Sequence, residues 1–254
     1  MRRAIGLLRL SDHCVFDQLR LEEALLRKTR RSWCVINDGV QSPAVVMGIS
    51  GKLEKLVDAE RARDQGVQVI KRFTGGGTVV LDRDSILVSL ICESQDTPEV
   101  PLFPRPLMKW SETFYDPIFS PHGEFRLSET DYTFGDLKFG GNAQYISKTR
   151  WLHHTSFLWD YQSERMRCLL HPPKEPEYRK SRKHLDFLCK LKDFLPARQA
   201  FVDDISAALW EANFDVREVS LEEVRAELGL VMDKGQSIQS TKRIEIWSVT
   251  TSAV

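Results

Sequence analysis

An irregular order of strand-like and helix-like segments predicts an α+β fold for this chain. Short β-branched and apolar runs bounded by turn residues are typical of buried strands. Helical patterns fall between these runs without regular βαβ alternation, which argues against a doubly wound sheet. The 254 residues, 42% of them hydrophobic and 28% charged, suffice for one large domain or two modest ones with a sizeable core.

Each expected element has a local reason in the sequence. Asp12 can cap a helix that begins at His13, because Phe16, Leu19 and Leu26 follow at a spacing that shares one helix face. Further helices are expected at 53–64, 107–119, 201–213 and 221–230. Strands are expected at 4–10, 34–36, 44–49, 67–70, 78–81 and 86–92, and in the Gly-punctuated stretch 131–159. Prolines predict connections at 98–106 and 171–183.

Composition limits the possible partners and compartments. Lys plus Arg and Asp plus Glu number 36 each, so bulk charge gives no support for binding nucleic acid. No apolar run approaches the roughly 18 residues of a membrane span, so no membrane partner is expected. Five scattered cysteines are typical of reduced thiols inside a cell. The basic, apolar start is too short for a targeting segment, and the mitochondrial matrix and the cytoplasm both remain open.

Three consecutive glycines, Gly75, Gly76 and Gly77, stand between two expected strands, three residues after Arg72. Glycine loses the most entropy on folding, so a run of three favours a tight turn or a backbone that a ligand touches. Such a loop can offer backbone N–H groups to an anion beside a guanidinium. By itself the pattern fits a flexible hairpin loop equally well, and it is neither a P-loop nor a dinucleotide fingerprint.

A dense polar turn is expected at 136–142, and it contains Lys138 just before Gly140 and Gly141. A lysine is a compact cation that can sit between a carboxylate and a phosphate, the two groups that are joined when an acid is adenylated. The alternative is a solvated lysine in a turn.

His153 and His154 lie within an apolar, strand-like run from Trp151 to Trp159. Adjacent residues on a strand face opposite sides, so at most one of the two can point into a given pocket. A two-histidine metal site is therefore disfavoured, and we expect no resident metal. The usual alternative is a hydrogen-bonded structural histidine.

The order of these motifs along the chain resembles that of the lipoate–protein ligase family. In sequence order the motifs are Ala44 to Gly48, Lys71-Arg72-x-x-Gly-Gly-Gly-x-Val, Asp82, Asp131, Lys138-x-Gly-Gly-x-Ala and His153-His154. The likeness runs from about residue 5 to about residue 195. It implies a mixed-sheet catalytic domain of the biotin/lipoate ligase type at 1–195. Residues 196–254 would then form a helical extension, a reduced form of the accessory region of two-domain ligases.

The resemblance also implies a reaction and its participants. Lipoic acid and ATP, with Mg²⁺, would form lipoyl-AMP and pyrophosphate. The lipoyl group would then pass to a lysine on the lipoyl domains of 2-oxo acid dehydrogenase E2 subunits or on the glycine cleavage H protein. Whether lipoate or octanoate is preferred stays open, because an apolar pocket discriminates poorly between small chain differences.

The resemblance assigns roles residue by residue. Lys138 matches the catalytic lysine, which contacts the acyl carbonyl and the phosphate, and Arg72 matches an arginine that meets the phosphate. Asp131 is implied to act toward Mg²⁺ or the nucleotide, and His154 to line the pocket. The nucleotide-wrapping loop is matched by Gly75, Gly76, Gly77, Thr78, Val79 and Val80.

Several departures and alternatives accompany the resemblance. Phe73 and Thr74 replace two small residues before the glycines, and Thr155 replaces a glycine. Octanoyl and lipoyl transferases of the same superfamily use a cysteine, but Trp151 and the surroundings of Phe125 stand where that thiol would be. The Gly-Arg-Gly-Arg loop of biotin ligases is absent. The alternatives to a ligase are an ATP-independent transferase that uses preformed lipoyl-AMP and a non-catalytic relative that binds lipoate or a lipoyl domain.

Overall fold

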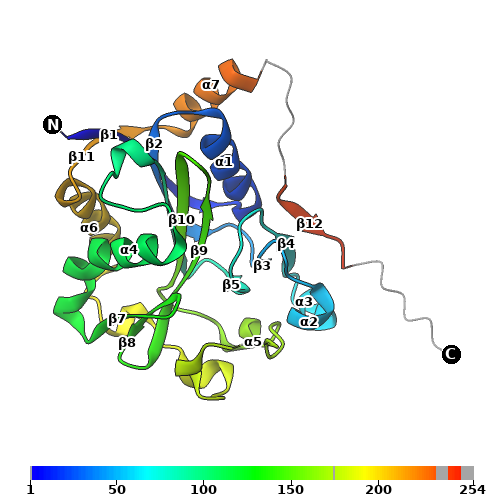
Figure 1. The fold of residues 1–254 in the computed structure, drawn as a ribbon. Coiled ribbons are helices and arrows are strands. Elements are labelled where there is room, and N and C mark those ends of the chain that lie inside the picture. The colour runs from blue at the N-terminus through cyan, green and yellow to red at the C-terminus, as the bar shows by residue number, and fades with distance from the viewer. Residues whose placement is uncertain (1, 174, 233–239, 247–254) are drawn as a thin grey trace.

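Two β-sheets and their flanking helices build the protein in a computed structural model, which describes residues 2–173, 175–232 and 240–246 (Figure 1). The larger sheet has eight strands in the order β11-β1-β2-β6-β10-β9-β8-β7. Its strands are β1 (Arg3–His13), β2 (Ser32–Val40), β6 (Ser85–Glu93), β7 (Phe125–Ser128), β8 (Asp131–Phe134), β9 (Leu137–Ile146), β10 (Arg150–Leu158) and β11 (Phe214–Val219). β1 runs parallel to β2 and to β11, whereas the other pairs are antiparallel, so the sheet is mixed as expected.

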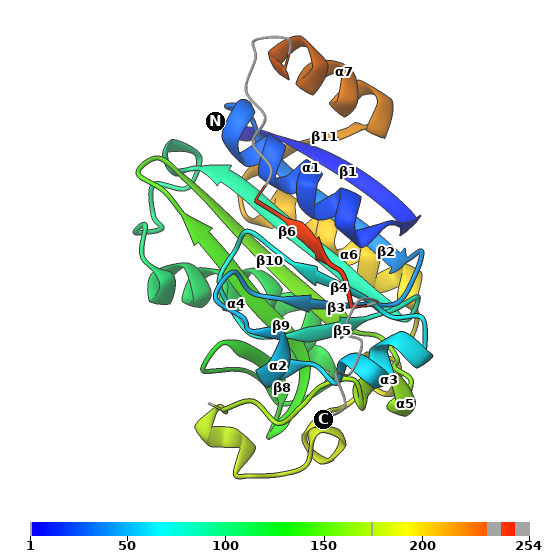
Figure 2. The ribbon, with the colours of Figure 1, turned by 90° about the vertical axis from the view of Figure 1, so that its right-hand side faces the viewer.

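A smaller sheet of four strands lies against one face of the larger sheet (Figure 2). Its order is β12-β4-β3-β5, and its strands are β3 (Ala44–Met47), β4 (Gln68–Lys71), β5 (Val79–Leu81) and β12 (Lys242–Ile244). The helices are α1 (Val15–Lys28), α2 (Leu53–Leu56), α3 (Ala59–Asp64), α4 (Pro104–Phe119), α5 (Ser163–Met166), α6 (Arg198–Glu211) and α7 (Leu221–Met232). Helices α4 and α6 cover one face of the large sheet through a core rich in aromatic side chains, and α1 covers the other face.

The first expected helix begins later than its capping pattern predicts. Asp12 has a left-handed φ of 47° and belongs to β1, which continues to His13. The residue before α1 is Cys14, which makes no capping hydrogen bond with its side chain. Pairing of β1 with β2, extended as far as His13 opposite Val40, therefore prevails over the local helix signal.

The prediction of a polar turn at 136–142 is wrong, because Leu137–Ile146 forms strand β9. The chain reverses just before it, where Gly135 has a φ of +55°. Gly140 lies under two aromatic rings, and a Cβ atom there would be 3.1 Å from Tyr132 and 3.3 Å from Phe157. Gly140 therefore makes room for core side chains within a strand rather than forming a turn. Similarly, the helix expected at 53–64 is split into α2 and α3 by Val57, which is buried.

The described residues beyond 195 do not form a separate core. Four fully buried side chains from this stretch join the same hydrophobic cluster as α4 and the large sheet: Phe201, Ile205, Leu209 and Phe214. Strand β11 adds to the sheet beside β1, and β12 pairs with β4 of the small sheet. The expected helical extension thus contains two strands, and position 195 marks no boundary between cores.

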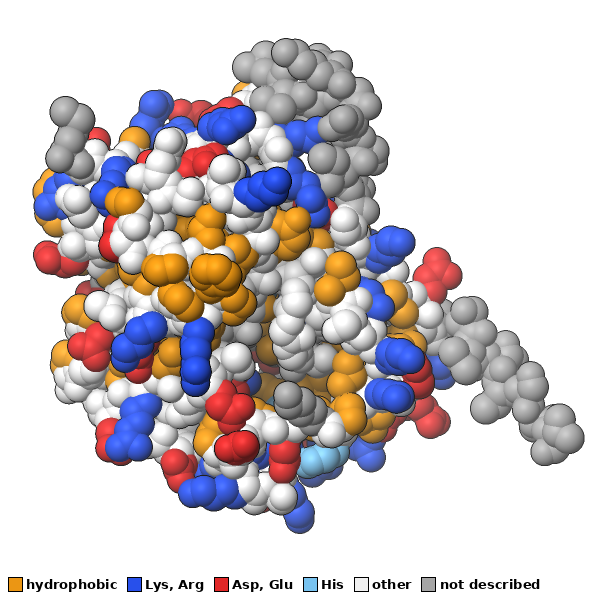
Figure 3. All heavy atoms as spheres, viewed as in Figure 1, with side chains coloured by type: hydrophobic (Ala, Val, Ile, Leu, Met, Phe, Trp, Pro, Cys, Tyr) orange, Lys and Arg blue, Asp and Glu red, His pale blue; other side chains and the backbone are white. Residues whose placement is uncertain are grey.

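The surface mixes charges of both signs, with orange apolar patches between them on the face shown in Figure 3. Within residues 2–173, 175–232 and 240–246, no helix has the length and apolar character needed to cross a bilayer.

Candidate active site

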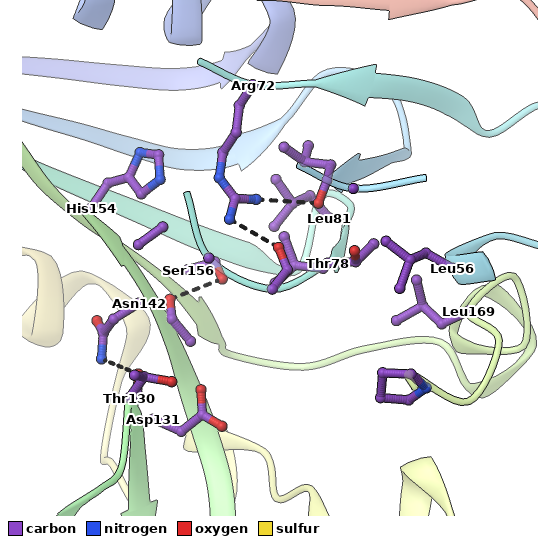
Figure 4. Close-up of a pocket in the computed structure, with 18 of the residues that line it drawn as sticks. Leu56, Arg72, Thr78, Leu81, Thr130, Asp131, Asn142, His154, Ser156 and Leu169 are labelled. Atoms are coloured by element: carbon purple, nitrogen blue, oxygen red, sulfur yellow. Dashed lines mark hydrogen bonds between the residues drawn. The ribbon is translucent and has the colours of Figure 1, made fainter. Parts of the chain in front are cut away.

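A cavity of about 710 Å³ lies where α1, the small sheet and strands β6, β9 and β10 meet (Figure 4). This volume falls within the range of roughly 300–1,000 Å³ that is usual for small-molecule sites. The segment from Leu169 to Phe187, hereafter the capping segment, also contributes lining residues, with residue 174 outside the described part. Eight of the ten residues that the resemblance assigned line this cavity: Arg72, Gly76, Gly77, Thr78, Val79, Asp131, Lys138 and His154.

Gly75 and Val80 are the two that do not line the cavity. Val80 follows Val79 on β5, and the side chains of neighbouring strand residues point to opposite faces of the sheet. Val80 therefore points away from the cavity and packs in a hydrophobic cluster with Val45 and Val69. Gly75 contributes a carbonyl oxygen that accepts hydrogen bonds from Arg72.

The guanidinium of Arg72 organises the glycine loop from within. Its Nη2 donates to the carbonyl oxygens of Gly75 at 2.7 Å and Gly77 at 2.9 Å, and its Nε donates to Thr74 Oγ1 at 2.9 Å. A further bond reaches the Val46 carbonyl oxygen at 3.3 Å. Burial lowers the pKa of Arg72 to about 10, partly opposed by the charge of Glu22. The side chain is therefore directed at the loop backbone and borders the cavity rather than projecting into it.

Among the three glycines, only Gly76 has a conformation and surroundings that require glycine. Its φ is +99°, and a Cβ atom would lie 2.8 Å from Arg72 Nη2 and 2.9 Å from the Ala143 Cβ atom. A Cβ atom on Gly48 would overlap the Gly76 carbonyl oxygen, so the two loops pack backbone to backbone. Gly75 and Gly77 face open space. The loop is thus held firmly at its middle residue between β3 and β9.

A buried polar chain connects α1 to this loop. Glu22, which is 1% exposed, accepts hydrogen bonds from Ser89 at 2.7 Å and from Gln18 at 2.8 Å. Its second oxygen lies 3.1 Å from His154 Nδ1, and His154 Nε2 lies 3.3 Å from Thr74 Oγ1. His154 is therefore oriented by a carboxylate on one side and by the glycine loop on the other.

The sequence reasoning missed Glu22 and Gln18, both of which line the cavity. One signal could have found them: they are four residues apart, on a helix face that otherwise carries Leu19 and Leu26. Polar side chains on the apolar face of a helix need buried partners, and such partners often belong to a site.

His153 points away from the cavity, as strand alternation predicts. It is fully buried beside Tyr132 and Gln144, and its Nδ1 atom lies 3.1 Å from Gln144 Nε2. Burial, together with a smaller contribution from the neighbouring His154, lowers the pKa of His153 to about 3.

Lys138 lies on β9, and its ammonium pairs with Asp131 on β8 at 2.9 Å. Gly141 leaves space beside it, because a Cβ atom there would be 3.2 Å from Lys138 Nζ. The second oxygen of Asp131 accepts a hydrogen bond from Tyr178 of the capping segment at 2.7 Å. Burial and the charge of Asp131 raise the pKa of Tyr178, which keeps its hydroxyl protonated as a donor.

The capping segment brings further groups to the polar side of the cavity. Arg179 pairs with Glu175 at 3.3 Å, and the backbone N–H of Glu177 donates to Glu129 at 2.6 Å. His184 also lines the cavity, and its pKa is lowered to about 4 by burial and then by the charge of Lys138. It is neutral near pH 7 and adds no positive charge there.

An apolar wall completes the cavity next to the glycine loop and α1. Its residues come from α1, β3, β5 and β6: Val15, Leu19, Val46, Val79, Leu81 and Leu87. Figure 4 shows Thr130, Asp131 and Asn142 gathered on one side, with Leu56 and Leu169 on another and Thr78 between them. The arrangement can therefore bind an apolar chain that ends in a negatively charged group.

The fold is a mixed-sheet α+β domain in which a lysine, a glycine loop and a histidine line one cavity. The Lipoyl protein ligase A/B catalytic domain family matches residues 14–213, and the chain belongs to that family. The resemblance drawn from the sequence motifs and the expected fold are thus both confirmed.

Curated relatives share moderate identity with this chain. "Inactive lipoate--protein ligase 2" of Plasmodium falciparum is 29% identical over 239 aligned positions, which cover 70% of this chain and 61% of that protein. "Putative lipoate-protein ligase A" of Saccharomyces cerevisiae is 25% identical over 177 positions, covering 66% of this chain and 42% of the yeast protein. The chain therefore spans less than two thirds of the length of these relatives.

Solved structures share the fold at lower identity. A putative lipoate protein ligase from T. acidophilum with bound lipoic acid matches with a TM-score of 0.68 and 19% identity, covering 92% of this chain and 96% of that one. A lipoate-protein ligase A bound with ATP matches with a TM-score of 0.67 and 20% identity, over 92% and 95% of the two chains.

Proposed function

We propose that this protein is a lipoate–protein ligase that activates lipoate with ATP and transfers the lipoyl group to a lysine of a lipoyl domain. The observation that carries the proposal is the meeting of Lys138, the Arg72-ordered glycine loop and an apolar wall around one cavity. The apolar wall can contact the chain of a carboxylic acid, and Lys138 and the glycine loop can contact a nucleotide phosphate.

In the first step, a carboxylate oxygen of lipoate attacks the α-phosphorus of ATP, and pyrophosphate leaves with the electrons of the broken P–O bond. Lys138 lines the cavity, and its ammonium lies beside Gly141, where a side chain would crowd it. A fixed positive charge at this point stabilises the negative charge that develops on the phosphate oxygens. Asp131 holds the ammonium in position until the nucleotide binds.

In the second step, the amine of an acceptor lysine attacks the acyl carbon of lipoyl-AMP. The C–O bond to the phosphate breaks, AMP leaves, and the amine loses a proton as the amide forms. Arg72 supports both steps by fixing the loop, with His154 oriented by Glu22 beside it.

Mg²⁺ enters the proposal as the companion of ATP. Within the described ranges, no group of three or more His, Cys, Asp or Glu side chains could hold a metal ion. Mg²⁺ usually binds through phosphate oxygens, water and one or two carboxylates. Asp131, which lies beside Lys138, would be the carboxylate available to it. The role toward Mg²⁺ remains an expectation for Asp131.

The similar structures support the choice of substrates and acceptor. One was solved with lipoic acid and another with ATP, and a bipartite lipoate protein ligase from Thermoplasma acidophilum was studied with its E2 lipoyl domain. By the same reasoning we propose lipoyl domains of 2-oxo acid dehydrogenase E2 subunits as acceptors, and the glycine cleavage H protein as a further one.

A second candidate function is ATP-independent transfer from preformed lipoyl-AMP. Arg72 and Lys138 are both engaged with protein groups, because Arg72 donates to loop carbonyls and Lys138 pairs with Asp131. Cations that are already paired are less available to the phosphates of ATP, which favours this second candidate. A relative at 29% identity carries the name "Inactive lipoate--protein ligase 2", so ATP-dependent activation is the step to test first.

Pyrophosphate release separates the two candidates. The full chain is mixed with lipoate, ATP, Mg²⁺ and a lipoyl domain, and the acceptor mass is measured beside released pyrophosphate. A ligase produces both signals. Acceptor modification from synthetic lipoyl-AMP alone would identify a transferase, and no modification from either donor would contradict both candidates.

Replacing Lys138 tests the site directly. We expect Lys138→Ala to lower lipoyl transfer by about 100-fold or more, because a fixed cation is lost where charge develops. Among the described residues Asp131 would keep Tyr178 as its hydrogen-bond partner but lose its cation, so the free energy of unfolding should fall by about 1–3 kcal/mol. The control is Lys192→Ala, which removes a lysine that pairs with Asp160 outside the cavity. Wild-type transfer by Lys138→Ala would overturn the assignment.

A further inference from the structure

Two lysines on the rim of the cavity, Lys52 and Lys55, have no role in the site described so far. Lys55 lies on the short helix α2 and Lys52 immediately precedes it, and both side chains are exposed and line the cavity. Within the part of the chain that the structure describes, neither ammonium group has an ion pair.

The other strong cations that line the cavity are already engaged with protein groups. Arg72 donates to loop carbonyls, Lys138 pairs with Asp131 at 2.9 Å, and Arg179 pairs with Glu175 at 3.3 Å. Four carboxylates also line the cavity: Glu22, Glu129, Asp131 and Glu175. A polyphosphate entering this cavity would meet an unfavourable potential unless unpaired positive charge faced it. Lys52 and Lys55 provide such charge.

The position of α2 relative to the glycine loop is set by the backbone. The Ile49 N–H donates to the Thr74 carbonyl oxygen at 2.9 Å, and Gly48 packs against the Gly76 carbonyl. Figure 4 shows Thr78 between the Asp131 side of the cavity and Leu56 of α2. Lys52 and Lys55 line the same cavity next to Leu56, so a phosphate chain that runs from the Asp131 side past Thr78 would approach them.

We propose that Lys52 and Lys55 form the subsite for the β- and γ-phosphates of ATP and for the departing pyrophosphate. This inference rests on the proposed ligase function and adds residues that none of the motifs indicated. As the bond between the α-phosphorus and the bridging oxygen breaks, negative charge collects on the pyrophosphate, and two ammonium groups stabilise it. Lysines on flexible, solvent-exposed stems also allow the product to leave.

The test uses the double variant Lys52→Ala/Lys55→Ala in the full chain, assayed with two acyl donors. With lipoate and ATP, we expect the KM for ATP to rise by about tenfold to a hundredfold, because charge-assisted contacts are lost. With preformed lipoyl-AMP, which lacks these phosphates, transfer should stay within about twofold of wild type. An unchanged KM for ATP would overturn the proposal.

Two matched variants control for charge and for surface changes in general. Lys52→Arg/Lys55→Arg keeps both charges and should retain most of the ATP affinity. Lys148→Ala removes an exposed lysine between β9 and β10, outside the cavity, and should behave as wild type. Equal losses with both donors, together with a raised KM for the lipoyl domain, would instead assign the lysines to acceptor docking and contradict the phosphate subsite.

A binding measurement separates this proposal from the ligase function itself. Calorimetric titration with pyrophosphate and Mg²⁺ needs no turnover, and the double variant should bind at least about tenfold more weakly than wild type. If wild type releases no pyrophosphate from ATP, the ligase proposal fails while this titration still tests the subsite. Equal pyrophosphate affinity in the two proteins would overturn the subsite.

Discussion

Arg72 and Glu22 show how buried charges shape this site at the scale of single residues. Arg72 gathers two loop carbonyls and the Thr74 hydroxyl, while Glu22 orients His154 from α1. Each charge is almost fully buried and hydrogen bonded, which is the condition for tolerating a charge away from water. The sequence indicated Arg72 through its glycine loop, but it gave no spatial reason to connect Glu22 with His154, since 132 positions separate them.

His153 should make the protein sensitive to acid. Its pKa is about 3 in the folded protein and 6.5 in the unfolded chain, so the unfolded state takes up a proton first as the pH falls. The stability contributed by the neutral ring is complete above pH 6.5 and is lost toward pH 3. Between pH 7 and pH 5, this group alone should lower the free energy of unfolding by roughly 2 kcal/mol.

Urea unfolding of wild type and His153→Gln at both pH values measures that difference. Glutamine keeps a polar partner for Gln144 and Tyr132 but does not titrate. The variant should therefore lose less stability than wild type between pH 7 and pH 5. Equal losses in the two proteins would mean that His153 is not held neutral in the folded state.

At the scale of elements, strand β9 carries the lysine motif and packs against the glycine loop. Its glycines, Gly140 and Gly141, are local sequence signals for a turn, but they serve close packing and space for Lys138. The loop packs against β9 at Ala143, where a Cβ atom on Gly76 would lie 2.9 Å from the Ala143 Cβ atom. Element boundaries were thus predictable where apolar runs were long, and failed where glycine served tertiary packing.

The three loop glycines should respond differently to alanine. Gly76→Ala should reduce activity strongly and destabilise the protein by about 1–3 kcal/mol, because φ is +99° and Arg72 and Ala143 leave no room. A Cβ atom on Gly75 or Gly77 would face open space. The free energy of unfolding of Gly75→Ala and Gly77→Ala should therefore stay within about 1 kcal/mol of the wild-type value. Thermal unfolding and the lipoyl transfer assay measure both effects. Equal sensitivity at all three positions would show that the loop requires glycine for flexibility instead.

At the scale of the whole molecule, the last described segments connect distant parts of the chain. Strand β12 pairs with β4, and the N–H groups of Ser240 and Thr241 donate to the buried carboxylate of Glu23 on α1. Ile246 is buried in the core below the small sheet, and its carbonyl accepts from Arg63 at 2.9 Å. The last described segment thus connects α1, which carries Glu22, with β4, which ends one residue before Arg72.

Truncation after residue 195 should therefore prevent folding. It removes Phe201, Ile205, Leu209 and Phe214, all with no exposed area, and leaves β1 as an unpaired edge. At about 1.5–3 kcal/mol for each side chain, the loss is roughly 6–12 kcal/mol, comparable with the whole stability of a typical domain.

Solubility and cooperative unfolding of residues 1–195 test this expectation. Ile205→Ala in the full chain should lower stability by about 2–5 kcal/mol, and Trp210→Ala, which changes a half-exposed residue on the same helix, should lower it far less. A truncated chain that unfolds cooperatively at the wild-type temperature would show that an independent domain ends near residue 195.

The sequence by itself determined the fold class, most strands and the set of motifs whose order identified the family. Hydrophobic periodicity and short motifs depend on residues close together in the chain, so they can be recognised from the sequence alone. Only the tertiary structure decided that Lys138 lies on a strand, that Glu22 supports His154, and that Lys52 and Lys55 face the same cavity. It also decided that the last described segments add one strand to each sheet. These relations depend on pairing and burial between residues far apart in the chain, and those energies exceed the local preferences of glycine, proline or a helix cap.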